Sequence, residues 1–412
     1  MISIIVLVLV FLLIAIRHIG RVRFRIWQVM LMGAVIVLIT NRITPLSALK
    51  AINLDVIGFL FGMFVLGQAL EESGYLAHIS QRFFHRGKSV DALVLIILFG
   101  SGALAALLMN DTLAIVGTPL LLLMALRNGI TAVPLLLALA FGVTTCSVLS
   151  PIGNPQNLLI ALNGGVNNPF LTFLRYLAVP TLFNMLVVYF MLKLYYPRYF
   201  KNGVLPPDAE PIKDRGLSFL CQISLVLLVA LILVKITLVF IIPQFDFRLT
   251  YIALIAALPV LVASRRRLEI VKRLDWSTLV FFAAMFILMA SVWDSGIFQS
   301  LLDHMQLDLP GQGTVLGISV VLSQFISNVP MVALYIPVLD KLSASTSAFM
   351  ALAAGSTIAG NLTILGAASN VIIIQSCENR SKETITFWEF FRIGLPLTVI
   401  NVLVYWLFLQ VV

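Results

Sequence analysis

The chain has 412 residues, of which 60% are hydrophobic and only 11% are charged, and its formal net charge is +9. Soluble domains carry roughly 25% charged residues. This composition, with a mean hydropathy of +1.06, therefore excludes a soluble globular protein and favours a polytopic membrane protein. The basic residues gather in alternate loops between apolar segments, which excludes a nucleic-acid-binding protein.

Apolar segments long enough to cross about 30 Å of hydrocarbon recur along the chain. Arginines follow the first segment, no cleavage pattern is clear and another span follows at once, so we interpret that segment as a retained helix and not a signal peptide. The sequence predicts an all-α protein with about ten transmembrane spans, at 2–16, 26–40, 55–72, 131–163, 172–193, 217–241, 250–263, 277–292, 346–376 and 385–410.

Two further apolar stretches, 91–126 and 312–340, are interrupted near their middles. The first begins and ends on the same predicted side of the membrane, which indicates a re-entrant hairpin with its tip at Asn110, Asp111 and Thr112. The second is expected to be its oppositely facing partner, with its tip at Ser327 and Asn328. Irregular backbone at such depth is tolerated only where protein or a wet cavity satisfies its polar groups.

Two of the predicted spans, 131–163 and 346–376, are too long for plain helices. Each contains a cluster of Gly, Asn and Ser or Thr residues, where an unwound turn is expected because Gly opens unusual dihedrals and Pro removes a backbone donor. The first break is predicted at Ser150, Gly153, Asn154 and Asn157. The second is predicted at Asn361, Thr363, Gly366, Ser369 and Asn370.

The spacing of these interruptions occurs twice along the chain. Asn110 precedes Pro119 as Asn328 precedes Pro337, and the spacing of Gly142, Gly153 and Asn157 matches that of Gly355, Gly366 and Asn370. Because the two copies run in opposite directions, we predict an inverted repeat. Its halves are 1–193 and 217–412, joined by a cytoplasmic linker, 194–216. We expect scaffold segments at 1–54 and 217–263, transport segments at 55–163 and 277–376, and closing helices at 172–193 and 385–410.

Lys and Arg residues set the predicted orientation. They concentrate in the loops at 17–25, 79–90, 194–216, 264–273 and 377–384, whereas the alternate loops keep only Arg42, Lys50, Arg248 and Lys341. Because cytoplasmic loops are the basic ones, we expect a multi-pass protein of the cytoplasmic (inner) membrane with both termini outside.

The four broken elements are expected to converge on a substrate site near the membrane midplane. Half-helix N-termini suit an anion, and carbonyl, Asn or Ser oxygens suit sodium. Asp111 is predicted to carry a coupling proton or to bind sodium, or else to cap the second hairpin helix. The candidate substrate- and ion-binding residues are Asn110, Asp111, Thr112, Ser150, Gly153, Asn154, Asn157, Ser327, Asn328, Asn361, Thr363, Gly366, Ser369 and Asn370, and the candidate sodium ligands are Asn110, Asp111, Asn157, Asn328 and Asn370.

Other charged residues receive structural interpretations. Asp55 and Asp275 each begin a span and are predicted as helix N-caps. Lys235 lies near the outer end of an apolar run and is predicted to snorkel towards the membrane surface. All four histidines fall in loops, and no catalytic pair, metal-ligand cluster or phosphate loop is evident, so an enzyme is not expected.

The motifs around Asn110-Asp111-Thr112, Ser150 to Asn157, Ser327-Asn328-Val329-Pro330 and Gly366 to Asn370 resemble those of the ion-transporter superfamily. This superfamily includes arsenite permeases, sodium/proton antiporters and divalent-anion:sodium symporters, together with citrate-transporter-like membrane proteins. The resemblance implies two hairpins and two broken helices per protomer, a site between the hairpin tips, a homodimer and elevator-type movement.

From these observations we expect a secondary active transporter of a small anion or oxyanion, working as a symporter or antiporter with sodium or protons and without an organic cofactor. The alternatives are an arsenite or antimonite efflux permease, a sodium/proton antiporter and, from another class, a re-entrant-loop ion channel. The chain contains no ATP-binding motif, and a separate ATPase partner stays open.

Overall fold

The computed structural model describes residues 2–16, 18–19, 22–23, 25–75, 78, 89–201, 212–241, 248–296, 310–326, 328–381 and 384–412. Over these residues the fold is helical, apart from one antiparallel pair of two-residue strands, β1 (His18–Ile19) and β2 (Val22–Arg23). The predicted all-α class is therefore confirmed.

Helices of the first part of the chain follow the predicted apolar segments closely. They are α1 (Ile2–Ile16), α2 (Ile26–Ile39), α3 (Pro45–Ala51), α4 (Leu54–Glu72), α6 (Val90–Leu95), α7 (Gly102–Leu108), α8 (Asn110–Asn128), α9 (Val133–Ser147), α10 (Pro155–Asn163) and α11 (Pro169–Tyr195). A π-helical turn, Ile96–Ser101, joins α6 to α7.

After a short 3₁₀ turn, Tyr199–Lys201, the second part begins. Its helices are α12 (Arg215–Ile241), α13 (Leu249–Ala263), α14 (Arg267–Lys272), α15 (Trp276–Trp293), α17 (Gln312–Ile326), α18 (Asn328–Lys341), α19 (Thr346–Ile358), α20 (Ala368–Arg380) and α21 (Phe387–Leu409). Two 3₁₀ turns, Ala359–Asn361 and Ile364–Gly366, lie between α19 and α20.

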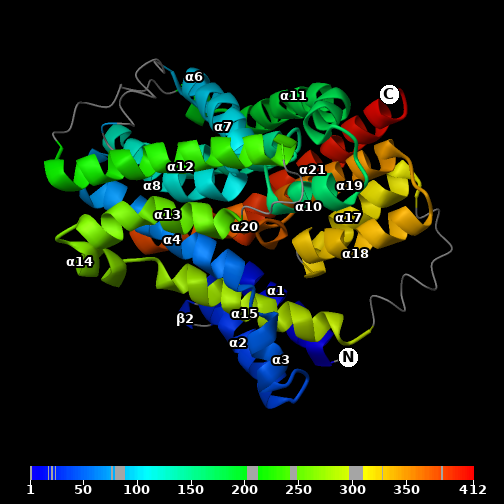
Figure 1. Cartoon of the computed structure of the whole chain (residues 1–412), viewed down its shortest axis with the longest axis horizontal. Helices are drawn as coiled ribbons and strands as arrows, with labels where there is room; N and C mark the ends of the chain where they lie inside the picture. The colour runs from blue at the N-terminus through cyan, green and yellow to red at the C-terminus, as the bar shows by residue number, and fades with distance from the viewer. Residues whose placement is uncertain are drawn as a thin grey trace.

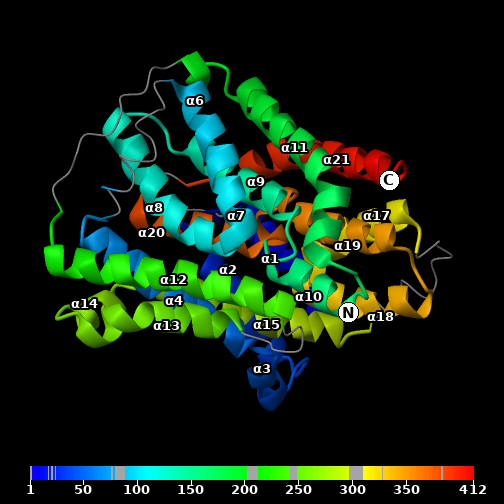
Figure 2. The same cartoon turned by 45° about the horizontal axis from the view of Figure 1, so that its top comes forward.

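Both long spans are broken where the sequence predicted, between α9 and α10 and between α19 and α20. The short helices α3 and α14 lie in segments that were predicted as loops; α3 projects from the body of the molecule in both views (Figures 1 and 2). In the described part of the chain, six helices are long and apolar enough to cross a membrane: Leu54–Glu72, Asn110–Asn128, Pro169–Tyr195, Arg215–Lys235, Trp276–Trp293 and Phe387–Leu409. The count of about ten spans and the re-entrant hairpins stay predictions.

Helices from distant parts of the chain pack in matching pairs. α4 lies against α12 and α13, which run beside it in Figure 1, and α15 lies against α1 and α2. α8 packs on α20, and α18 packs on α10. Each pair joins one helix from before the predicted linker with one from after it.

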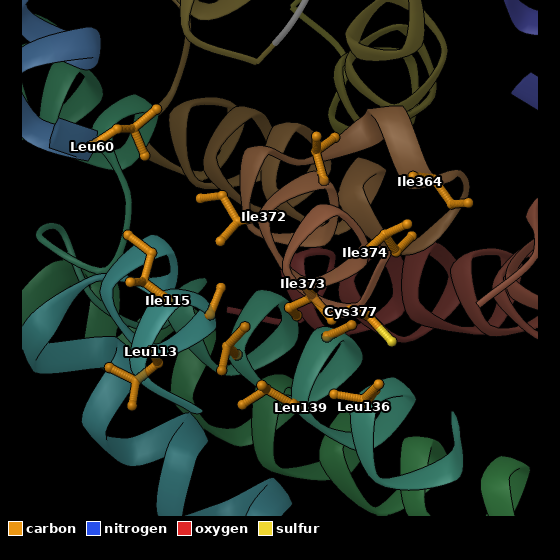
Figure 3. Close-up of a cluster of buried hydrophobic side chains, with 14 of the residues drawn as sticks. Leu60, Leu113, Ile115, Leu136, Leu139, Ile364, Ile372, Ile373, Ile374 and Cys377 are labelled. Carbon is orange, nitrogen blue, oxygen red and sulfur yellow. The ribbon is translucent and has the colours of Figure 1, made fainter. Parts of the chain in front are cut away.

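Apolar side chains hold these pairs together. Figure 3 shows Ile115 of α8 and Ile372 of α20 in a buried cluster with Leu60 of α4 and with Leu136 and Leu139 of α9. All five side chains are less than 10% exposed. Burial of apolar area against a partner helix, together with close packing, therefore fixes α8 and α20 beside each other.

Candidate functional site

A cavity of about 440 Å³ lies where four helices begin. The first residues of α8, α10, α18 and α20 all contribute to its wall. The complete wall is Asn53, Asp55, Val56, Phe59, Met109, Asn110, Asp111, Pro155, Gln156, Leu158, Lys235, Arg248, Thr250, Phe282, Met285, Phe286, Asn328, Val329, Leu365, Gly366, Ala367, Ala368 and Val371. The cavity is thus mostly apolar with a few convergent polar groups, as ligand pockets commonly are.

The turn between α7 and α8 forms one tip at the cavity. Met109 joins the two helices with a φ of 71°, a positive value that residues other than glycine rarely adopt. The Asn110 backbone NH donates to the Gly153 carbonyl at 3.1 Å, and the Asn110 side-chain Oδ1 accepts from the Asp111 backbone NH at 2.9 Å. Asp111 Oδ1 is buried and has no hydrogen-bond partner in the described part of the chain. The N-cap position of α8 is Met109 and no side chain of the described residues caps this helix, so the alternative prediction of Asp111 as its cap is wrong. The ion-binding role of Asp111 stays a prediction.

The start of α18 borders the same cavity and corresponds to the second predicted tip. Asn328 begins α18, and its Nδ2 donates to the Gly366 carbonyl at 3.1 Å. Its Oδ1 is buried without a hydrogen-bond partner among the described residues. Ser327, predicted at this tip, lies outside the residues that the structure describes. Each tip is therefore bonded to the glycine of the break in its own half, Gly153 or Gly366.

The break between α9 and α10 is held by two amide side chains. Asn154 caps α10, because its side-chain Oδ1 accepts from the Asn157 backbone NH at 2.8 Å. Asn157 Nδ2 lies 3.1, 3.3 and 3.0 Å from the carbonyls of Ser147, Val148 and Ser150. These bonds satisfy carbonyls that the end of α9 leaves without helical partners.

Amide side chains also hold the break between α19 and α20. Asn370 Nδ2 donates to the Gly360 carbonyl at 2.5 Å. Asn361 Nδ2 lies 3.0 Å from both Thr145 Oγ1 and Asn401 Oδ1. Thr363 Oγ1 donates to Gln324 Oε1 at 2.7 Å. Asn361 connects this break to α9, and Asn154 connects the first break back to Thr357 at 3.1 Å, so the two breaks brace each other.

The two glycines at the breaks allow very close backbone approach. A Cβ added at Gly153 would lie 2.3 Å from the Ser147 carbonyl oxygen, and one at Gly366 would lie 2.4 Å from the Ala359 carbonyl oxygen. Neither distance is accessible to a real side chain. Glycine is therefore required at both breaks for a packing reason.

Four of the predicted site residues border the cavity: Asn110, Asp111, Asn328 and Gly366. The remaining described candidates lie behind its wall and are all buried where they carry side chains; they are Thr112, Ser150, Gly153, Asn154, Asn157, Asn361, Thr363, Ser369 and Asn370. Their contribution to binding stays a prediction. Sequence reasoning missed several polar residues of the wall, namely Asn53, Asp55, Gln156, Lys235, Arg248 and Thr250.

One of the missed residues, Asp55, is predicted from the sequence as a helix N-cap. The N-cap of α4 is Asn53, whose Oδ1 accepts from the Asp55 amide at 3.1 Å, so the prediction of Asp55 as that cap is wrong. Asp55 instead pairs with Arg248 at 3.0 Å and accepts from Thr250 Oγ1 at 3.2 Å. Asp275 does cap α15, through the Thr278 amide, as predicted.

The far end of α4 carries a second ionic cluster, remote from the cavity. Glu71 pairs with Arg380 at the end of α20. Glu72 pairs with Arg266 at 3.2 Å and Arg273 at 3.5 Å, beside α14. At about 1.5 Å of rise per residue, roughly 25 Å separates this cluster from the Asp55 end of the helix.

Broken helices and a cavity at four helix N-termini are features of integral membrane transporters. A family model described as Citrate transporter matches residues 8–348. The chain belongs to this citrate transporter family.

Similar proteins are named as transporters. An uncharacterized transporter of Mycobacterium tuberculosis is 29% identical over 398 residues, which cover 90% of this chain and 89% of the relative. The silicon efflux transporter LSI3 of Oryza sativa is 26% identical over 442 residues, with 90% of this chain and 89% of the relative covered. The YdaH transporter structure of Alcanivorax borkumensis aligns with 99% of this chain and 96% of its own at a TM-score of 0.47 and 16% identity.

Proposed function

We propose that the protein is a secondary active transporter of a small anion or oxyanion in the cytoplasmic membrane, coupled to sodium or protons. The observation that carries this proposal is the convergence of four helix N-termini on one cavity. Each N-terminus acts as roughly half a positive charge and leaves backbone NH groups without helical partners. An anion in the cavity would accept from these groups in surroundings that contain little water.

Asp111 is proposed to bind the coupling ion. Its buried Oδ1 and that of Asn328 both lack hydrogen-bond partners among the described residues, and both residues border the cavity. Carboxylate and amide oxygens suit sodium, and a carboxylate also suits a proton. Of the other predicted sodium ligands, Asn110 shares its Oδ1 with the Asp111 amide, and Asn157 and Asn370 bond to the breaks. We assign these three to positioning.

Alternating access is proposed to occur by movement of the tips and breaks, α7 to α10 and α17 to α20, against α1, α2, α4, α12, α13 and α15. This division moves α4 and α15 from the transport segments expected from the sequence to the scaffold. The packing of α4 on α12 and α13, and of α15 on α1 and α2, supports a scaffold of this composition. With the basic loops inside, the cavity end of α4 faces outward and the Glu71–Arg380 pair lies towards the inner side. The homodimer and the outside position of both termini belong to the same proposal.

A second candidate is an efflux permease for an uncharged hydroxylated compound, such as arsenous or silicic acid. The similarity to the silicon efflux transporter of rice favours this candidate. Its substrate would use the same NH groups and amide oxygens as hydrogen-bond partners. A re-entrant-loop channel differs from both, because it would conduct without a coupling ion.

The test is uptake into proteoliposomes. A labelled panel of arsenite, silicic acid, sulfate, phosphate, succinate and citrate is offered under an imposed sodium or proton gradient. Accumulation of an anion against its gradient is expected, and it should disappear in Asp111→Asn. The control Asp340→Asn removes an exposed carboxylate of α18 and should leave uptake unchanged. Purely downhill flux, insensitive to both gradients, would instead indicate a channel.

A further inference from the structure

Lys235 belongs to the buried stripe of α12. The residues of this helix that face α4 and α13 recur at helical spacing, and Cys221, Ser224, Leu228 and Ile232 are all less than 10% exposed. Lys235 continues that stripe one turn further and is 5% exposed. Its neighbours in sequence point the other way: Leu233 and Val234 are 57% and 47% exposed. The lysine is therefore directed inward, and the predicted snorkelling to the membrane surface is wrong.

The cavity wall contains two basic residues at different depths. Arg248 and its partner Asp55 have side chains that are 52% and 51% exposed, so this ion pair lies at the mouth. Lys235 borders the same cavity and is nearly inaccessible. Because solvent screens exposed pairs strongly, the deeper lysine has the larger effect on a bound ion.

Part of the cavity wall that Lys235 borders is apolar. Val56, Phe59, Phe282 and Phe286 contribute to the wall. Beside such a wall, charges attract each other several times more strongly than they do in water. Asn110, Asp111 and Asn328 border the same cavity, so the lysine and the two predicted tips face one binding space.

We propose that Lys235 is the anion-selecting residue of the cavity: its ammonium group binds the negative charge of the substrate and raises the affinity for anions over uncharged compounds. This inference rests on the proposed transport function and names the substrate class as anionic. Lys235 lies on α12, which packs with α4 and α13, whereas Asp111 and Asn328 lie on the tips. If the tips move against α12, the lysine acts on the substrate only while the cavity is open to the outside.

The first experiment measures the concentration dependence of uptake for the anion that the wild-type protein accumulates. Lys235→Gln should raise KM at least tenfold, whereas Lys235→Arg, which keeps the charge, should stay within about threefold of wild type. The control Lys50→Gln removes an exposed lysine of α3 and should have no effect. Thermal denaturation in detergent is recorded for every variant, and the midpoint of Lys235→Gln should match that of Lys235→Arg.

A charge-restoration experiment covers the case in which Lys235→Gln folds poorly. Lys235→Cys is treated with one of two methanethiosulfonates, one that adds an ethylammonium group and one that adds a methyl group. Wild-type protein treated in the same way shows the effect of modifying the native cysteines. Only the charged adduct should restore low KM, and bound anion should slow the modification.

Two outcomes separate the two proposals. If the wild-type protein accumulates an anion and Lys235→Gln keeps the wild-type KM, or if both adducts restore uptake equally, the role of Lys235 is refuted while the transport function stands. If the wild-type protein accumulates no anion under either gradient, the proposed function fails, and the inference about Lys235 fails with it.

Discussion

Asn157→Ala tests whether the amide at the first break is a structural brace. The change removes the donor that serves the carbonyls of Ser147, Val148 and Ser150, and the oxygen that accepts from Thr357 Oγ1 at 3.2 Å. An amide NH₂ has two hydrogens, so it makes about two full hydrogen bonds to these three carbonyls. The substitution removes those two bonds and also the bond that Thr357 Oγ1 donates. Each buried group left without a partner costs about 1–3 kcal/mol. With about three such groups, we expect a loss of about 3–9 kcal/mol in the stability of the folded protein.

The assay is thermal denaturation of purified protein in detergent, followed by uptake at a temperature where the variant is still folded. A fall of several degrees in the midpoint is expected, with KM close to wild type for the fraction that remains folded. Asn163→Ala, which removes an exposed amide at the end of the same helix, provides the control. A variant Asn157→Ala with an unchanged midpoint and a strongly raised KM would refute the reasoning, because the amide would then be a substrate ligand.

Two further substitutions test the backbone of the break and the cavity mouth. Gly153→Ala places a Cβ 2.3 Å from the Ser147 carbonyl and should abolish transport, whereas Gly129→Ala, with φ 59° and nothing within 4 Å, should cost only about 1 kcal/mol; similar uptake by the two variants would contradict this. Arg248→Gln breaks the half-exposed pair with Asp55 and should change stability by less than about 1 kcal/mol; salt titration of uptake should show a slower initial rate at low ionic strength only.

The sequence predicted most helix boundaries because membrane helices must be apolar throughout. The interruptions of that pattern at Asn110, Gly153, Asn328 and Gly366 identified residues that meet at the cavity and its adjacent breaks. Spacing alone, however, gave no way to tell an amide that faces the cavity from one that bonds to backbone. Asn157 and Asn328 looked equivalent, but only Asn328 borders the cavity, and only Asn157 has both its side-chain amide atoms hydrogen-bonded.

Residues outside the repeated pattern were the ones missed. Lys235 and Arg248 have no counterpart in the repeat. Lys235 was interpreted from its position near the end of an apolar run, and Arg248 was placed in an outside loop. Their place in the wall depends on how α12 and α13 rotate against α4, which is a tertiary property. The helical spacing from Cys221 to Lys235 was the available signal, because it placed the lysine on the buried face of α12.

The cross-packing of α8 on α20 and of α10 on α18 has a consequence for biosynthesis. Asn154 finds its partner Thr357 only after about 200 more residues have been made, which at roughly 5–20 residues per second takes about 10–40 s. Until then the first half must wait in the bilayer with its broken helix unbraced. Ribosome stalling or truncation before α19 should therefore yield a nascent chain that quality-control proteases recognise. The two halves expressed separately should survive only when they are made together.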